Sequence, residues 1–406
     1  MQQKSKAAVF IGQAFGTGIY RHLAFLGVEL YKACPSDIEF YFASVEREAN
    51  PGAWSIVREV VPPKNILCEQ SFEDLTARCV ELARSYEKVL IHAGGGWGQT
   101  KHFVRTRKRV GKELAKRIIF MGTTHSYRND SLLRIPMSLF QHVLYRLYYR
   151  MIVFQCKDAA NRFMGGNHLI RIGRGTVIPL GCEPFGTPSV EPPSGICGNA
   201  RLLDVLRDES FFKFVYLAGF RPGKMHVWLV KALAPLLKSY PDARVLFCGK
   251  GAQEVIDATL AAIREEQLDE QILLPGQIAR EEVPWLLTHC NCAVVPSRSE
   301  TFGHNFLEPM FAGLPVLGTR VGIGRDIIKD GETGYAFDLK QPKSVQDVAE
   351  KVLADRAEAR AMGQHAKAFV ETRFTHEAVA HQLVDLYAKL LTCDESSSRH
   401  TRTLTG

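Results

Sequence analysis

The sequence predicts an α/β protein built from two doubly wound domains, and three observations support this. Short strand patterns alternate with helical patterns, which is typical of parallel sheets covered by helices on both faces. The alternation runs through residues 1–183, stops in a Pro/Gly/Ser-rich stretch, and starts again after residue 210. The length of 406 residues suits two to three domains at roughly 150 residues each.

The first half begins with an apolar run at Ala7–Ile11, which indicates a buried strand. A Gly-spaced loop follows, and then Ile19, Leu23, Leu26 and Leu30 recur at helical spacing. The later strands of this half are expected at Ile38–Ala43, Val89–Ala93, Ile118–Gly122, Ile152–Phe154 and Val177–Pro179. Helices are expected between them, notably at Leu75–Tyr86 and Phe103–Lys116.

The second half repeats the pattern after the proline-rich segment Glu183–Asn199, which we interpret as an interdomain connection. Its strands are expected at Phe214–Leu217, Arg244–Cys248, Ile272–Leu274, Cys292–Pro296 and Pro315–Gly318, with helices such as Trp228–Tyr240 and Glu254–Glu266. We therefore expect domains at 1–183 and 211–374 joined by a linker at 184–210. A helix at 375–391 could pack back on the N-terminal domain, and a polar tail at 392–406 is expected to be disordered.

Charge is distributed unevenly between the two halves. The net charge is +8, yet residues 1–183 hold 26 Lys+Arg against 15 Asp+Glu, and residues 184–406 hold 25 against 28. The ten cysteines form no CxxC pair, which favours reduced core thiols, with a metal site at Cys290 and Cys292 as the weaker alternative. No run of 18 apolar residues occurs and the first apolar run is short, so we expect a cytoplasmic protein without a signal peptide or a membrane span.

The segment PSRSETFGHNFLE carries the strongest chemical signal. A strand ends, a loop follows, and a helix is expected to begin near Gly303–Asn305. Free N–H groups of residues 303–306 and the helix dipole would form an anion site. Glu300 before it and Glu308 inside the helix would bracket a phosphate, and carboxylates accept hydrogen bonds from sugar hydroxyls. A nucleotide-sugar has this layout. Equally, Glu300 could be a solvated loop charge and Glu308 a partner of the helix dipole.

The same two carboxylates carry a family resemblance. With seven residues between them, Glu300 and Glu308 resemble the E-x7-E signature of retaining GT-B glycosyltransferases of glycosyltransferase family 4. The family's other motifs are matched by AGLPV, by KDG with TG, by VLFCGKG and by LPG, all within residues 214–340. The N-terminal half matches only loosely. The resemblance implies a GT-B fold, in which two Rossmann-like domains face each other across a cleft.

The resemblance also implies roles for the donor site. Glu308 would hold the ribose hydroxyls and Glu300 would contact the transferred sugar. Arg221 and Lys224 would neutralise the diphosphate, although the family has Gly after the Lys and here Met225 follows. The remaining donor-binding residues would be Gly16, Gly18, Gly249, Gly276, Phe302, Gly303, His304 and Asn305.

Loops of the first half resemble the parts of the family that approach the donor sugar and the acceptor. His125, which follows the strand expected at Ile118–Gly122, resembles a catalytic His near the transferred sugar. Gly16 and Gly18 could equally form only a tight βα turn. The acceptor-binding residues are expected to be His92, Gly95, Trp97 and His125.

No DxD motif is present, so we expect neither a metal nor another cofactor; the nucleotide-sugar, most simply a UDP-sugar, is a co-substrate. The resemblance implies a retaining hexosyltransferase acting in synthesis of cell-surface polysaccharide, lipopolysaccharide or glycolipid. A nucleotide-sugar epimerase and an inactive GT-B binding protein are the alternatives.

Two segments favour an acceptor at a membrane surface. Residues 101–117 hold eight Lys/Arg against one Glu, and residues 134–154 mix arginines with aromatic residues as an interfacial helix does. A core helix with solvated arginines is the alternative for 134–154. We expect a glycan or lipid-linked acceptor, peripheral contact with the inner face of an anionic cytoplasmic membrane, and no nucleic acid, because no binding motif accompanies the charge.

Overall fold

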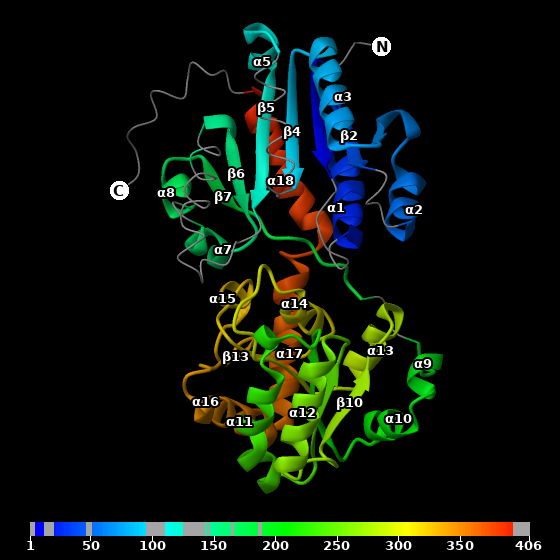
Figure 1. Ribbon diagram of the computed structural model, residues 1–406, viewed down its shortest axis with the longest axis vertical. Coiled ribbons are helices and arrows are strands. Elements are labelled where there is room, and N and C mark those ends of the chain that lie inside the picture. The colour runs from blue at the N-terminus through cyan, green and yellow to red at the C-terminus, as the bar shows by residue number, and fades with distance from the viewer. Residues whose placement is uncertain are drawn as a thin grey trace. The chain divides into compact units, whose positions relative to one another are not determined.

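The computed structural model describes residues 5–11, 20–45, 51–94, 110–124, 143, 147–163, 166–185 and 189–392. The chain divides into two compact units. Unit 1 comprises Met1–Glu183 and Phe374–Gly406, and unit 2 comprises Pro184–Arg373. Each unit contains one parallel sheet with helices packed on it (Figure 1).

Within the described residues, the sheet of unit 1 has seven strands in the order β3-β2-β1-β4-β5-β6-β7. All its pairings are parallel; β1, for example, pairs with β2 through Ala8 and Phe40 and with β4 through Ala8 and Leu90. The strands are β1 (Lys6–Ile11), β2 (Ile38–Val45), β3 (Ile66–Glu69), β4 (Lys88–Gly94), β5 (Ile118–Thr124), β6 (Met151–Phe154) and β7 (Gly175–Val177). The short strand β3 was missing from the sequence prediction.

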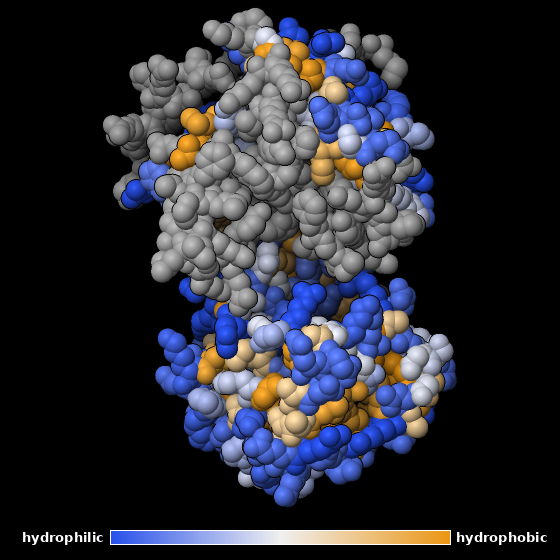
Figure 2. Space-filling model, in the orientation of Figure 1, coloured by the Kyte–Doolittle hydropathy of each residue, from blue (hydrophilic) through white to orange (hydrophobic). Residues whose placement is uncertain are grey.

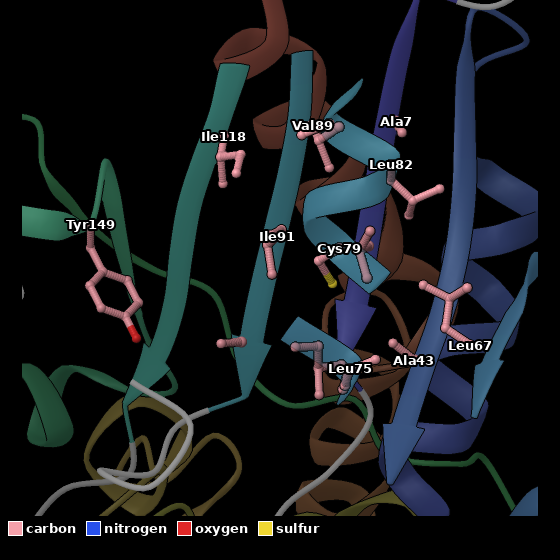
Figure 3. Close-up of a cluster of buried hydrophobic side chains, with 14 of the residues drawn as sticks. Ala7, Ala43, Leu67, Leu75, Cys79, Leu82, Val89, Ile91, Ile118 and Tyr149 are labelled. Carbon is pink, nitrogen blue, oxygen red and sulfur yellow. The ribbon is translucent and has the colours of Figure 1, made fainter. Parts of the chain in front are cut away.

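Alternate residues of these strands face opposite layers of helices. Figure 3 shows Cys79 of α3 near Ile91 of β4, in a core cluster that also contains Leu75 of α3 and Ala7 of β1. On the other face, α18 packs along α1 and contacts β4. The helices of unit 1 are α1 (Tyr20–Ala33), α2 (Pro51–Val60), η2 (Pro63–Asn65), α3 (Phe72–Ser85), α5 (Lys112–Arg117), α7 (Lys157–Arg162), α8 (Gly166–Arg171) and α18 (His376–Thr392).

Unit 2 has a six-stranded parallel sheet in the order β10-β9-β8-β11-β12-β13. The described strands are β8 (Phe212–Leu217), β9 (Ala243–Cys248), β10 (Ile272–Gly276), β11 (Cys292–Val295), β12 (Val316–Gly318) and β13 (Gly334–Ala336). The sequence prediction lacked β13, which has only three residues. Two halves of the sheet are wound outward from β8 and β11, so the strand order reverses between these two strands.

Helices cover this sheet as well: α11 packs with α12, and α14 packs on β11 and against α17. The helices of unit 2 are α9 (Ser194–Cys197), α10 (Ala200–Arg207), η4 (Pro222–Lys224), α11 (His226–Ser239), α12 (Gln253–Glu265), η5 (Arg280–Glu282), α13 (Val283–Thr288), α14 (His304–Phe311), α15 (Gly324–Ile327), α16 (Pro342–Ala354) and α17 (Arg356–Glu371).

Besides the missed strands β3 and β13, the structure differs from the sequence prediction in three segments. The helix expected at Phe103–Lys116 begins, within the described residues, only at Lys112, because Val110 and Gly111 precede α5 without helical structure. The expected linker at 184–210 contains α9 and α10 and belongs to unit 2, because Leu202 and Leu206 of α10 are buried in that unit. The expected interfacial helix at 134–154 is wrong for Met151–Phe154, which form the inner strand β6 with Ile152 and Phe154 buried. Residues 134–142 and 144–146 of that segment, and residues 101–109, lie outside the described residues.

No described helix is both long enough and apolar enough to cross a bilayer. Figure 2 shows hydrophilic residues over much of the visible face of unit 2, with apolar residues in separate areas between them.

Candidate functional site

The candidate site lies at the carboxyl edge of the sheet of unit 2, where the loops after β8 and β11 meet. Open parallel sheets bind ligands at the point where the strand order reverses, and here that point lies between these two strands. The two loops are bonded to each other, since the Arg298 N–H donates to the Gly223 carbonyl over 2.9 Å. The Tyr216 hydroxyl of β8 donates to the Lys224 carbonyl over 3.1 Å. The fold therefore holds both loops in one place.

Glu300 is fixed at the centre of this site. Its Oε1 accepts hydrogen bonds from the Lys224 ammonium, from Ser297 Oγ at 2.7 Å and from Asn305 Nδ2 at 3.2 Å. The Glu300 side chain is 10% exposed and that of Lys224 is 21% exposed. Ser297 is fully buried and its Oγ lies 3.1 Å from the Tyr216 hydroxyl. The carboxylate therefore comes from the β11 loop and its cation from the β8 loop.

Gly303 makes the turn from this loop into α14. Its φ of 103° lies in the left-handed region, and a Cβ there would stand 2.9 Å from the Phe306 ring and 3.3 Å from Glu300 Cγ. The helix begins at His304, as the sequence predicts. The expectation of free N–H groups at 303–306 needs one correction, because the Phe306 N–H donates to the Gly303 carbonyl at 3.0 Å. Phe302 is only 3% exposed, so its ring packs inside unit 2 and is not offered to a ligand.

Glu308 lies one turn further along α14 and has a partner that the sequence did not reveal. Its Oε1 accepts a hydrogen bond from Arg280 Nη1 at 2.9 Å. The Glu308 side chain is 13% exposed and that of Arg280 is 37% exposed. Arg280 follows β10 in the segment QIAREE, where neither spacing nor composition distinguishes it from a surface arginine.

A second contributor missed from the sequence is Gly322, in the loop after β12. Its φ is 53°, and a Cβ there would stand 2.3 Å from the Phe302 carbonyl oxygen and 2.7 Å from Glu300 Cβ. The neighbouring Ile323 N–H donates to the same carbonyl at 2.6 Å. The β12 loop thus supports the backbone that carries Glu300. The only available signal was a glycine pair after a predicted strand.

The two glycines predicted to approach the nucleotide lie together at the same edge. The Gly249 N–H donates to the Gly276 carbonyl at 2.8 Å. A Cβ on Gly249 would stand 2.1 Å from the Ala218 carbonyl oxygen, whereas one on Gly276, at φ 83°, would have no atom within 4 Å. The backbone at Gly276 is therefore open to a ligand. Arg221 is exposed, and no described residue forms an ion pair with it.

Of the site residues predicted in unit 1, only His92 lies in the described part of the chain, and it is buried. His92 is 2% exposed, lies on β4 two residues before the strand ends, and contacts the Tyr387 hydroxyl of α18 through Nδ1 at 2.6 Å. Burial lowers the pKa of His92 to about 3, so the ring is neutral. The structure therefore places it inside unit 1 instead of at a surface that meets an acceptor. The other predicted residues of this unit, Gly16, Gly18, Gly95, Trp97 and His125, lie outside the described residues.

His92 borders a small apolar pocket that is also lined by Phe10 and Leu23, among others. Within the described part of the chain, no group of three or more His, Cys, Asp or Glu side chains is arranged to share a metal ion. Metal independence remains a prediction.

Comparison with known proteins identifies the family of this region. Residues 204–369 match the model of the family described as glycosyl transferases group 1. These residues belong to that family. The match spans most of unit 2 and includes Glu300, Glu308 and Arg280, so the family predicted from the E-x7-E resemblance is confirmed.

Curated relatives match over less than half of their own length. The N-acetyl-alpha-D-glucosaminyl L-malate synthase of Bacillus anthracis is 29% identical over 182 residues, which is 45% of this chain and 46% of the relative. The D-inositol 3-phosphate glycosyltransferase of Corynebacterium urealyticum is 29% identical over 182 residues, 42% of each chain.

Solved structures show that the fold extends over nearly the whole chain. HepE of Anabaena, crystallised with UDP and glucose, has a TM-score of 0.68 at 16% identity and covers 94% of this chain and 99% of its own. Sucrose-phosphate synthase from Thermosynechococcus elongatus has a TM-score of 0.65 at 18% identity, covering 96% and 100%. The two doubly wound α/β units have the GT-B fold that the sequence predicts.

Proposed function

We propose that this protein is a glycosyltransferase that takes a hexose from a nucleotide-sugar, most simply a UDP-sugar, and transfers it with retention of anomeric configuration. The observation that carries the proposal is the pair of anchored carboxylates, Glu300 and Glu308, on either side of the start of α14. Curated relatives that match part of this chain are named as glycosyltransferases, and HepE was crystallised with UDP and with UDP-glucose.

The site offers each part of a nucleotide-sugar a chemically suitable partner. The backbone at the start of α14 and the helix dipole would hold the distal phosphate. Lys224 and Arg221 would stabilise the charge that develops on the departing diphosphate. Glu300 would accept from hydroxyls of the transferred sugar and Glu308 from those of the ribose.

The reaction breaks the anomeric C–O bond through an oxocarbenium-like state. In a front-face reaction the acceptor hydroxyl attacks from the side the nucleotide leaves, and a phosphate oxygen of the donor takes the hydroxyl proton. The new glycosidic bond then keeps the donor's configuration. Lys224 and the α14 amides provide the positive charge for the leaving group without a metal ion.

A release assay tests the proposal. The protein is incubated with UDP-, GDP- and ADP-sugars and a lipid extract, and free nucleotide is measured. We expect release from one donor with acceptor present, about 10²-fold or more slower in Glu300→Gln, and weaker donor binding in Glu308→Ala. Proton NMR of the product should show the anomeric configuration of the donor, and the rate should persist in EDTA. No release and no nucleotide binding with any donor would overturn the proposal.

We further propose a glycan or lipid-linked acceptor brought to unit 1 at the inner face of an anionic cytoplasmic membrane. The excess of 26 Lys+Arg over 15 Asp+Glu in residues 1–183 supports this. Flotation with phosphatidylserine vesicles should be salt-sensitive and should be lost when Arg105, Arg107, Lys108 and Arg109 are changed to Gln. Equal flotation of the variant and the parent protein would reject the membrane contact.

A further inference from the structure

Arg280 is the cation beside the second carboxylate of the donor site. It lies in the turn η5 after β10, and its Nη1 reaches Glu308 Oε1 on α14 at 2.9 Å. These residues are 28 positions apart in the chain, so the contact depends on the fold and not on local helix geometry. Arg280 has no role in the sequence motifs described above.

The turn that carries Arg280 is itself anchored. Glu282, the last residue of η5, is 9% exposed, and its Oε1 accepts a hydrogen bond from the Gly195 N–H at 2.7 Å. A Cβ on Gly195 would stand 2.5 Å from that oxygen, so a larger residue there would displace the Glu282 carboxylate. The Glu282 N–H also donates to the Ala279 carbonyl at 2.9 Å. The base of the Arg280 side chain is therefore held in place.

The contact leaves part of the Glu308 carboxylate available. In the described part of the chain, Arg280 is the one side chain that hydrogen-bonds this carboxylate, and it does so at Oε1. Each carboxylate oxygen has two acceptor sites. Oε2 and the second lone pair of Oε1 can therefore accept from two neighbouring hydroxyls, while the guanidinium fixes the direction in which the carboxylate points.

The positive charge of Arg280 also matters, because the donor is an anion. A nucleoside diphosphate brings negative charge to a place that already contains Glu300 and Glu308. Both carboxylates are largely buried, with 10% and 13% of the side chain exposed, so repulsion from the diphosphate is only partly screened. Lys224 balances Glu300 and Arg280 balances Glu308.

We propose that Arg280 is a positioning residue that aligns Glu308 with the ribose diol of the donor and so sets the preference for a ribonucleotide over its 2′-deoxy counterpart. The inference rests on the proposed function, because it assumes that a nucleoside diphosphate occupies this site. Arg280 would act through Glu308 and would take no part in bond breaking. Its loss should therefore raise the donor KM while kcat changes little.

The test is a set of binding constants measured by titration calorimetry with UDP and 2′-deoxy-UDP. A site built around a hydroxyl group discriminates strongly against the analogue that lacks it. We expect the wild type to bind UDP at least about tenfold more tightly than 2′-deoxy-UDP. In Arg280→Gln, the Kd for UDP should rise about tenfold and the preference should fall to about twofold, as for the loss of one charge-assisted hydrogen bond. Arg280→Lys keeps the charge without the planar fork and should restore part of the affinity.

Two controls separate positioning from general damage. Arg201→Gln removes an Arg–Glu pair of unit 2 that is exposed on both sides, in which Arg201 Nη2 lies 3.1 Å from Glu270 Oε2, and should leave both constants unchanged. In a Glu308→Ala background, Arg280→Gln should not alter the preference further, since the group it positions is absent. If Arg280→Gln does not fold, the same comparison is made with Arg280→Lys, whose preference should lie between those of the wild type and Glu308→Ala.

The outcomes distinguish the two proposals. If the wild type binds none of UDP, GDP and ADP, the proposed function fails and the inference fails with it. If the wild type binds UDP and the folded Arg280 variant keeps the same preference over 2′-deoxy-UDP, the inference is wrong and the proposed function stands.

Discussion

His226 offers a quantitative test of the packing beneath the candidate site. It follows Lys224 and Met225 at the start of α11, is 1% exposed, and lies against the rings of Phe220 and Tyr216 at 4.2 and 5.0 Å between centroids. Neither ring nitrogen has a hydrogen-bond partner in the described part of the chain. Burial, with a smaller contribution from the Lys224 charge, lowers the pKa of His226 to about 4.

This shift makes the stability of unit 2 depend on pH in a defined direction. An unfolded His has a pKa of about 6.5 and takes up a proton as the pH falls below that value. The folded His226 stays neutral until about pH 4. The unfolded state therefore binds more protons in this window, and stability falls as the pH falls. From these two pKa values, the loss between about pH 7.5 and pH 5 is about 2 kcal/mol.

The assay compares wild type with His226→Phe. Phenylalanine keeps an aromatic ring at position 226 but cannot take up a proton. Any packing cost of its larger ring is the same at both pH values and cancels in the comparison. Urea unfolding at the two pH values, with hydrogen exchange of α11 to identify the transition of unit 2, gives the difference in unfolding free energy. We expect the difference to move in favour of the variant by about 2 kcal/mol on going from pH 7.5 to pH 5. A difference that does not change with pH would refute a buried neutral imidazole at this position.

Three further predictions concern the loops of the site. Met225 has a left-handed φ of 62°, at a position where the family usually has glycine. A β-branched residue is strained at such a φ, so Met225→Val should melt several degrees below Met225→Gly. Equal melting temperatures would contradict backbone strain at this position. Gly322→Ala should lower nucleotide release about tenfold or more in a folded protein, because its methyl group would stand 2.3 Å from the Phe302 carbonyl oxygen; unimpaired release would show that this loop does not position Glu300. Ser297→Ala removes one donor to Glu300 and should lower the unfolding free energy by about 1–3 kcal/mol in urea titrations, whereas no change would mean that the hydroxyl is dispensable.

The sequence predicts the sheets well because buried parallel strands are apolar runs bounded by turns. Ala7–Ile11 and Arg244–Cys248 lie within β1 and β9 for that reason. Ile66–Glu69 was missed because ILCE is a short strand with a polar end, and its strand pairing with β2 decides its structure. The linker was misjudged because prolines at 184–193 conceal the amphipathic helix α10 that follows them.

Some residues of the candidate site could be predicted from the sequence and others could not. Glu300, Gly303 and Glu308 could be found because a local motif places them around one helix start. Arg280 could not, since its partner is 28 residues away and the contact depends on how η5 sits beside α14. His92 was misplaced because a residue two positions before a strand end still alternates with the strand, which turns it toward α18.

The central claim is that a nucleotide-sugar binds at the start of α14, between the two anchored carboxylates. A crystal structure of the protein with UDP tests this most directly. We predict the distal phosphate at the backbone of residues 302–305, within reach of Lys224, and the ribose hydroxyls at Glu308 beside Arg280. A diphosphate bound elsewhere, with Glu300 and Glu308 contacting no part of the ligand, would contradict the account.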